Sequence, residues 1–168
     1  DEVWPAQTTY SFTVPGTEFT AVERLKITWY NGGILPSVSG SHLPPREGLP
    51  VSGSMFIGES GTLVLPHVAA PRLYFEGTGF SDQYEMADDR DHYHGWIDGC
   101  LTGKQPSDDF QYGARLTESI LLGGIAVRYP KTKLLWDAEK MQFSNNDDAN
   151  QHVTREYREG WDLKALIG

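Results

Sequence analysis

The sequence predicts an α+β fold, with an open, mostly antiparallel β-sheet and helices packed on one face. Strand-like alternation fills the first half of the chain, and helical periodicity fills much of the second half. No strand–helix alternation typical of a parallel, doubly wound sheet occurs. The 168 residues fit one domain, residues 1–168, and the 39% of hydrophobic residues supply enough apolar material for a core.

Five segments of the first half have strand patterns: 8–14, 25–30, 54–58, 62–65 and 72–75. The third and fourth segments flank a tight turn in which Gly61 supplies a permissive backbone, so they form the clearest hairpin. Residues 34–52 form a long loop with four prolines, a length typical of a lid, a binding loop or disorder. Residues 76–90 are polar and irregular.

A first helix is predicted from Asp91, a plausible N-cap, to Gly103, a natural residue after a helix end. Its apolar side chains recur at i, i+3, i+4, i+7 and i+8, which predicts a buried stripe. The stripe consists of Tyr93, Trp96, Ile97, Cys100 and Leu101. The single cysteine excludes an internal disulfide, and its place in this stripe favours a core residue over a nucleophile.

A second helix is predicted over 114–129, before Pro130, which cannot continue a helix. Its apolar side consists of Leu116, Ile120, Leu121, Ile125 and Val127. Residues 134–136 and 141–143 are predicted to be short extended pieces, and 146–157 is predicted to be a third short helix.

Charge and hydropathy exclude several classes of partner. The formal net charge of −9 argues against nucleic acid and against anionic membranes. No apolar run approaches the roughly 18 residues needed to span a bilayer, and no signal peptide opens the chain. Because there is no initiator methionine, we expect a processed end or a cut inside a longer protein. The compartment, cytoplasmic or periplasmic, stays open.

No common catalytic or cofactor motif is present. The Gly-rich phosphate loops, H-E-x-x-H, G-x-S-x-G and C-x-x-C are absent from the sequence. His92 and His94 lie two residues apart, about 200° around a helix, so they cannot share one metal ion. We therefore predict no metal site and no catalytic residue in this chain.

Two groups of residues are candidates for ligand binding. His92 and His94 lie at a helix start, where free N–H groups favour anionic or hydroxyl-rich ligands. Trp29, Tyr30 and Asn31 end a strand before the Pro-rich loop and are predicted to form a stacking wall for a sugar. The alternatives are capping and packing for the histidines, and ordinary core and turn for the wall.

Several ordered blocks of the sequence resemble the C-terminal domain of Gfo/Idh/MocA family oxidoreductases, in the branch common in Bacteroidetes and Planctomycetes. The blocks cover nearly the full chain in the expected order. They are T-W-Y-N-G-G at 28–33, G-S-M-F-I-G-E-S-G-T at 53–62, H-Y-H-G-W-I-D-G-C at 92–100, L-T-E at 116–118, L-L-G at 121–123, L-W-D at 135–137 and R-E-Y-R-E-G-W at 155–161.

The resemblance implies a longer parent protein with an N-terminal Rossmann domain that binds NAD or NADP and carries the catalytic lysine of a Glu-Lys-Pro motif. Neither the cofactor site nor that lysine lies in this chain, so the chain alone is expected to be inactive. The implied role is to wall the pocket for a sugar, polyol or derivative and to form subunit contacts. A homo-oligomer through the open sheet face is expected.

Two other function classes are compatible with the sequence. One is a stand-alone carbohydrate-binding module that uses the residues of the wall and the histidines. The other is a dimerisation module that pairs through the polar sheet face, which consists of Thr9, Ser11, Thr13, Thr28 and Tyr30.

Overall fold

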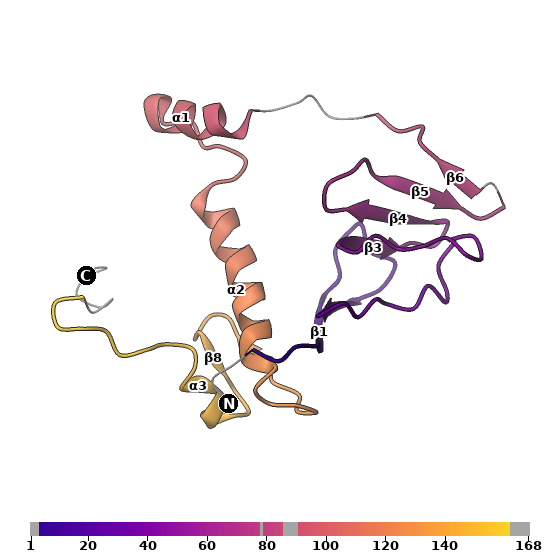
Figure 1. The fold of residues 1–168 in the computed structure, drawn as a ribbon. Coiled ribbons are helices and arrows are strands. Elements are labelled where there is room, and N and C mark those ends of the chain that lie inside the picture. Colours follow the sequence, from indigo (N-terminus) through magenta and orange to yellow (C-terminus); the bar gives the residue numbers. More distant parts are fainter. Residues whose placement is uncertain (1–3, 78, 86–90, 162–168) are drawn as a thin grey trace. The chain divides into compact units, whose positions relative to one another are not determined.

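The computed structural model describes residues 4–77, 79–85 and 91–161 and divides the chain into two compact units, Asp1–Leu101 and Thr102–Gly168 (Figure 1). The predicted α+β class is confirmed: all strand pairs of the described residues are antiparallel, and three helices occur there. The strands are distributed among three separate sheets, with orders β1-β2, β3-β4-β5-β6 and β7-β8.

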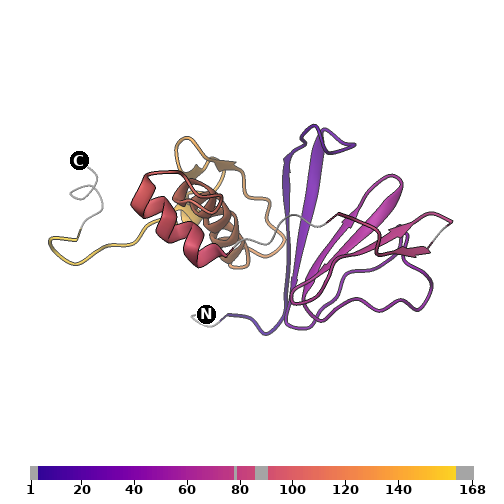
Figure 2. The same cartoon turned by 90° about the horizontal axis from the view of Figure 1, so that it is seen from above.

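The first sheet pairs β1 (Thr8–Pro15) with β2 (Arg24–Asn31), and Figure 2 shows its two long strands in purple. Both strands were predicted. Because partners across a strand pair share a face, the register gives this sheet one apolar and one polar face. The apolar face carries Tyr10, Phe12, Val14, Leu25, Ile27 and Trp29. The polar face carries Thr9, Ser11, Thr13, Lys26, Thr28 and Tyr30.

The second sheet is a meander of four strands: β3 (Gly53–Ile57), β4 (Gly61–Pro66), β5 (Arg72–Phe75) and β6 (Gly79–Ser81). The predicted hairpin corresponds to β3 and β4, and the strand predicted at 72–75 corresponds to β5, so both predictions are confirmed. The last strand, β6, lies in a segment that the sequence predicts to be irregular. It was missed because it has only three residues and begins at Gly79, whose φ is +73°.

The Pro-rich loop covers one face of this second sheet. The backbone N–H of His42 donates to Thr62 Oγ1 over 3.0 Å, and Glu47 Oε1 accepts from Arg72 Nη1 and the Tyr74 hydroxyl over 2.9 and 2.8 Å. Thr62 and Tyr74 are only 1% and 2% exposed. The loop is therefore an ordered cover that satisfies buried polar groups of β4 and β5.

The helix α1 (His92–Thr102) begins and ends as predicted. The Asp91 carboxylate accepts from the backbone N–H groups of Tyr93 and His94, both over 3.0 Å, and Gly103 has a φ of +70°. The predicted burial of its apolar stripe is wrong: Tyr93 is 72% and Leu101 79% exposed, and Cys100 is exposed too. Periodicity identified the face, but nothing in the described residues buries it.

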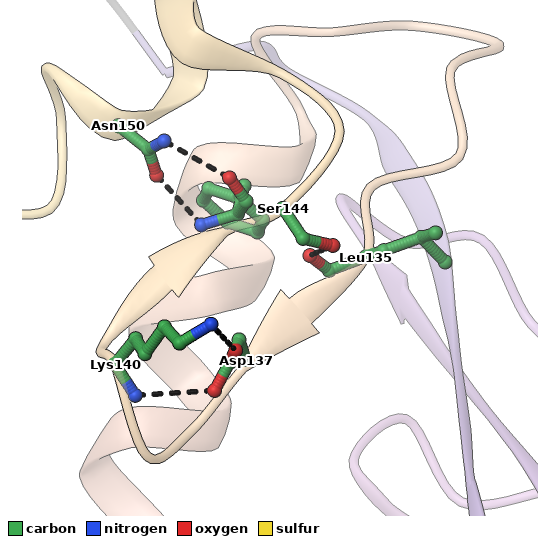
Figure 3. A network of polar contacts seen from close by, with 6 residues as sticks. Leu135, Asp137, Lys140, Ser144 and Asn150 are labelled. Carbon is green, nitrogen blue, oxygen red and sulfur yellow. Dashed lines mark hydrogen bonds and ion pairs between the residues drawn. The ribbon is translucent and has the colours of Figure 1, made fainter.

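The second unit contains α2 (Phe110–Ala126), the hairpin β7 (Trp136–Asp137) with β8 (Gln142–Phe143), and α3 (Asp147–Asn150). Each element overlaps a predicted one. Helix α2 begins four residues before its predicted start because Asp109 caps it, and helix α3 is shorter than predicted. The Asn150 side chain accepts from the Phe143 N–H over 2.6 Å and donates to its carbonyl over 3.0 Å, which ties α3 to β8 (Figure 3).

The core of this unit consists of Ile125, Phe143 and Ala149, with partly buried apolar side chains around them. Trp136 packs against Phe143 with ring centroids 5.0 Å apart, and its indole N–H donates to Glu118 over 2.7 Å. Figure 3 shows the polar contacts that close the hairpin, including Lys140 with Asp137 and Ser144 with Leu135.

The predicted apolar side of the second helix is buried only at its C-terminal end. Ile125 is in the core, whereas three other members remain exposed. These are Leu116, Ile120 and Leu121. The predicted burial of these three is therefore wrong for the described residues, because the small hairpin covers only the last turns of α2.

The N-cap of α2 makes its stability depend on pH. The backbone N–H of Tyr112 and then the Gln105 side chain hold the pKa of the Asp109 carboxyl below its ordinary 3.8. A lowered pKa in the folded state gives stability that is present above pH 3.8 and is lost as the pH falls through the folded-state pKa. We expect Asp109→Ala to lower the melting temperature at pH 7, and this difference should shrink below pH 3.8.

Thermal melts followed by circular dichroism check this prediction. They run from about pH 7 to about pH 2.5, the range over which carboxyl groups titrate. Asp108→Ala removes the neighbouring exposed carboxylate and serves as the control. A melting difference for Asp109→Ala that does not change with pH would contradict the capping role.

Candidate functional site

The apolar face of the β1–β2 sheet carries an aromatic platform, formed by Tyr10, Phe12 and Trp29. The rings of Tyr10 and Trp29 are parallel to within 3°, with centroids 6.2 Å apart. Phe12 meets Tyr10 edge-on, with centroids 5.6 Å apart. Trp29 is 47% exposed, whereas burial raises the pKa of the Tyr10 phenol. The platform therefore presents an indole whose orientation is fixed by a stacked neighbour.

The predicted wall of three residues is divided between the two faces of the sheet. Trp29 and Asn31 lie opposite Tyr10 and Thr8 on the apolar face, whereas Tyr30 lies opposite Thr9 on the polar face. The three residues therefore cannot form one wall, because neighbouring side chains on a strand point to opposite faces. Asn31 ends β2 at the apolar face, within reach of a ligand on the platform.

The turn after Asn31 is held close to the start of β1. Gln7 donates from its side-chain amide to the Gly32 carbonyl over 3.1 Å. Gly32 has a φ of +74°, and a Cβ there would lie 1.9 Å from the Ala6 carbonyl oxygen. The glycine is thus required by both conformation and space, and it fixes where the platform ends.

The two predicted histidines lie in the first turn of α1 and are exposed. His94 Nδ1 is 3.1 Å from Asp91 Oδ2, and its side chain is 75% exposed. The His92 ring packs against Tyr93, with centroids 4.1 Å apart. The backbone N–H groups of Tyr93 and His94 donate to the Asp91 carboxylate, so a carboxylate of the chain already occupies the anion position at this helix start. Each imidazole nevertheless remains open to a neutral, hydroxyl-rich ligand.

The candidate residues thus lie on two separate elements, β2 and α1. Their chemistry is recognition: indole and phenol rings pack on the apolar face of a sugar ring, and amide and imidazole groups hydrogen-bond hydroxyls. In the described residues, no group of three or more His, Cys, Asp or Glu side chains could hold a metal ion.

The most connected polar cluster lies under the Pro-rich loop and consists of Glu47, Arg72 and Tyr74. Burial and then the hydrogen bond to Glu47 raise the pKa of the Tyr74 phenol, so this group stays protonated at neutral pH. The Arg72 Nε atom is buried without a hydrogen-bond partner. Glu47 accepts from both other groups, so the cluster fastens the loop to β5.

The sequence missed the platform partners and this cluster for different reasons. The alternation in β1 placed Tyr10 and Phe12 on one side, but the residue of β2 that lies opposite Tyr10 depends on a strand register that the alternation does not fix. Glu47 lies 25 residues before Arg72, in a loop without periodicity. No local signal in the sequence could identify that contact.

Replacing Glu47 with alanine should lower the free energy of unfolding by about 1–3 kcal/mol, because it leaves the buried Tyr74 hydroxyl and the Arg72 guanidinium without their acceptor. Urea denaturation measures this difference. Glu59→Ala, at an exposed glutamate in the β3–β4 turn, is the matched control and should change stability by less than about 0.5 kcal/mol. Equal effects of the two substitutions would contradict the fastening role.

Comparison with family models, with curated proteins and with solved structures found no match to this chain. In the described residues, no helix has the length and apolar character needed to cross a membrane.

Proposed function

We propose that this chain is the substrate-pocket and subunit-contact domain of an NAD- or NADP-dependent oxidoreductase that acts on a sugar, a polyol or a derivative. The chain supplies the recognition surface. An N-terminal Rossmann domain of the parent supplies the cofactor and the catalytic lysine, so the chain alone is inactive. The ordered sequence blocks that resemble the Gfo/Idh/MocA family support the oxidoreductase part of this proposal.

The observation that carries the proposal is the aromatic platform. An exposed indole stacked parallel to a phenol gives the flat, apolar surface on which the C–H face of a pyranose packs. Asn31 lies at the rim of the same face, where its amide can donate to and accept from ring hydroxyls. A charged substrate would need a cationic partner, and the two cations of β2, Arg24 and Lys26, alternate onto the opposite face of the sheet.

The starts of α1 and α2 do not fit a nicotinamide cofactor. A dinucleotide pyrophosphate needs free backbone N–H groups at a helix N-terminus. In α1 the backbone N–H groups of Tyr93 and His94 already donate to the Asp91 carboxylate, and in α2 that of Tyr112 donates to the Asp109 carboxylate. Two negatively charged caps would also repel a pyrophosphate. This arrangement supports a cofactor site on another domain.

Extensive exposed apolar surface supports a further domain or subunit that covers it. The uncovered face of the second sheet includes Phe56 at 56% exposure, and α1 and α2 expose their apolar stripes. Large exposed apolar patches are typical of surfaces that a partner covers. Cover by another domain or subunit agrees with the role that the resemblance implies, which is to wall a substrate pocket and to form subunit contacts.

Calorimetric titration of the chain with NADH and with a panel of neutral sugars and polyols tests the proposal. We expect a saturable heat with at least one sugar or polyol and no saturable heat with NADH. Tight NADH binding by the chain alone would overturn the assignment of the cofactor site to another domain. Absence of binding to every sugar and polyol would overturn the recognition role.

The platform also favours a second candidate function, a stand-alone carbohydrate-binding module. The stacked pair lies wholly within one sheet and needs no other domain to form. The pocket domain and the stand-alone module differ in how a preceding domain would change their affinity for sugar. A module keeps its sugar affinity unchanged when the preceding domain is present, whereas a pocket domain gains affinity when the cofactor-binding domain completes the pocket.

A further inference from the structure

We propose that two copies of this chain pair through β1, with Ser11 on the two-fold axis, to form one continuous four-stranded sheet in the order β2-β1-β1-β2. This inference deepens the subunit-contact part of the proposed function and depends on that part alone. The sequence predicts a homo-oligomer that pairs through the polar sheet face. The proposed dimer instead pairs the edges of two β1 strands.

The first reason is that β1 is an open edge without protection. In the described residues, β1 has one strand neighbour, β2, and a two-stranded sheet is marginally stable in water unless it gains strands or packing. Natural edge strands are normally protected by charged residues. None of the eight residues of β1 is charged, whereas β2 carries Arg24 and Lys26. The charges therefore protect the β2 edge and leave the β1 edge available.

The second reason is that β1 is self-complementary. Pro15 has no N–H and ends the strand, so the residues available for pairing are 8–14, whose midpoint is Ser11. In the antiparallel register centred there, Tyr10 lies opposite Phe12 of the second copy, Thr9 opposite Thr13, and Thr8 opposite Val14. Aromatic and threonine cross-strand pairs of this kind stabilise antiparallel sheets.

The third reason is that this register continues both faces of the sheet. Ser11 and Thr28 already share a hydrogen bond of 3.0 Å between their hydroxyls. The axis places the two Ser11 side chains next to each other, so four hydroxyls form a row across the dimer. On the other face, Phe12 of the second copy extends the aromatic platform beyond Tyr10, and each platform then contains residues of both copies.

The other open edges of the described residues fit a second copy less well. β3 also lacks charges, but it has five residues and begins at Gly53, so it offers fewer pairs. β6 has three residues. The net charge of −9 opposes association of two copies in general, which favours the contact through a strand that carries no charge.

Two lysine substitutions test the pairing by sedimentation equilibrium of the full chain. Ser11→Lys and Thr28→Lys remove the same hydrogen bond and add the same charge to the same face. In the proposed dimer, the two residues at position 11 lie about 5 Å apart, and the two at position 28 lie about 14 Å apart, three strand spacings. Screening at physiological salt acts over about 8 Å, so only the first pair repels strongly.

We expect a wild-type dimer whose dissociation constant rises at least about tenfold in Ser11→Lys and less than about threefold in Thr28→Lys, since like charges directly opposite on paired strands destabilise them. A wild-type monomer would overturn both the inference and the subunit-contact part of the proposed function. A dimer that responds equally to both substitutions would overturn pairing through β1 alone. In either case Tyr10 and Trp29 stay stacked within one copy, so the sugar titrations test the recognition role separately.

If circular dichroism shows that a lysine variant does not fold, cysteine cross-linking tests the pairing instead. With the exposed Cys100 replaced by serine, Ser11→Cys should form a disulfide dimer under mild oxidation, because opposite Cα atoms about 5 Å apart suit a disulfide. Thr28→Cys in the same background should remain unlinked. Equal linking at both positions, or none at position 11, would overturn the pairing.

Discussion

A chain carrying Trp29→Ala should bind its sugar or polyol at least about tenfold more weakly than the wild-type chain, because it loses the exposed ring of the platform. The Tyr10 phenol then faces water on the side where the indole was stacked, and no other aromatic ring lies opposite it on β2. Calorimetric titration with the sugar that gives the strongest heat measures the change.

Tyr30→Ala is the matched control for this experiment. It removes an aromatic ring from the next residue of the same strand, but from the opposite face of the sheet. Its sugar affinity should stay within about threefold of wild type. A larger loss from Tyr30→Ala than from Trp29→Ala would show that sugars bind the polar face and would contradict the assignment of the platform.

Phe143→Ala should lower the free energy of unfolding of the second unit by about 3–5 kcal/mol. The ring is 3% exposed, packs against Trp136, and lies in the core with Ile125 and Ala149. A core this small has few other side chains to fill the cavity. Urea denaturation followed by tryptophan fluorescence measures the loss, since the indole of Trp136 contacts the ring that is removed.

The control for the core is Leu121→Ala, which removes a similar apolar side chain from the exposed side of α2. Leu121 is 62% exposed, so its replacement should cost less than about 0.5 kcal/mol. A loss as large as that of Phe143→Ala would mean that the exposed side of α2 is buried in solution, as a second copy or another segment would require.

The strands and helix ends were predictable because their signals are local. Alternation over residues 8–14 and 25–30, and the tight turn before Gly61, depend on neighbours within a few residues. Asp91 and Gly103 bound α1 for the same reason, since caps satisfy backbone groups of a single turn. The α+β class follows from the order of these elements.

Burial was not predictable in the same way, because periodicity identifies a face but not what covers it. The stripe of α1 has the spacing of a core face, yet Tyr93 and Leu101 are exposed in the described residues. The loop contact of Glu47 with Arg72 joins residues far apart in sequence and has no pattern that would reveal it. Three-residue strands such as β6 are too short to alternate visibly.

The candidate site was predictable in part. The sequence identified Trp29 and Asn31, which share the apolar face, but it grouped Tyr30 with them although strand alternation places that ring on the other face. It could not identify Tyr10 as the stacked partner, because the register across the turn at 16–23 depends on the exact start of β2. The roles of His92 and His94 remain predictions.

The most direct test of the central claim, that this chain is the pocket domain of a larger oxidoreductase, is the sequence of the coding region upstream of the Asp1 codon. We expect an open reading frame that encodes a strand followed by G-x-G-x-x-G and, further on, a Glu-Lys-Pro motif. A start codon immediately upstream, or a reading frame without a dinucleotide-binding motif, would contradict the claim.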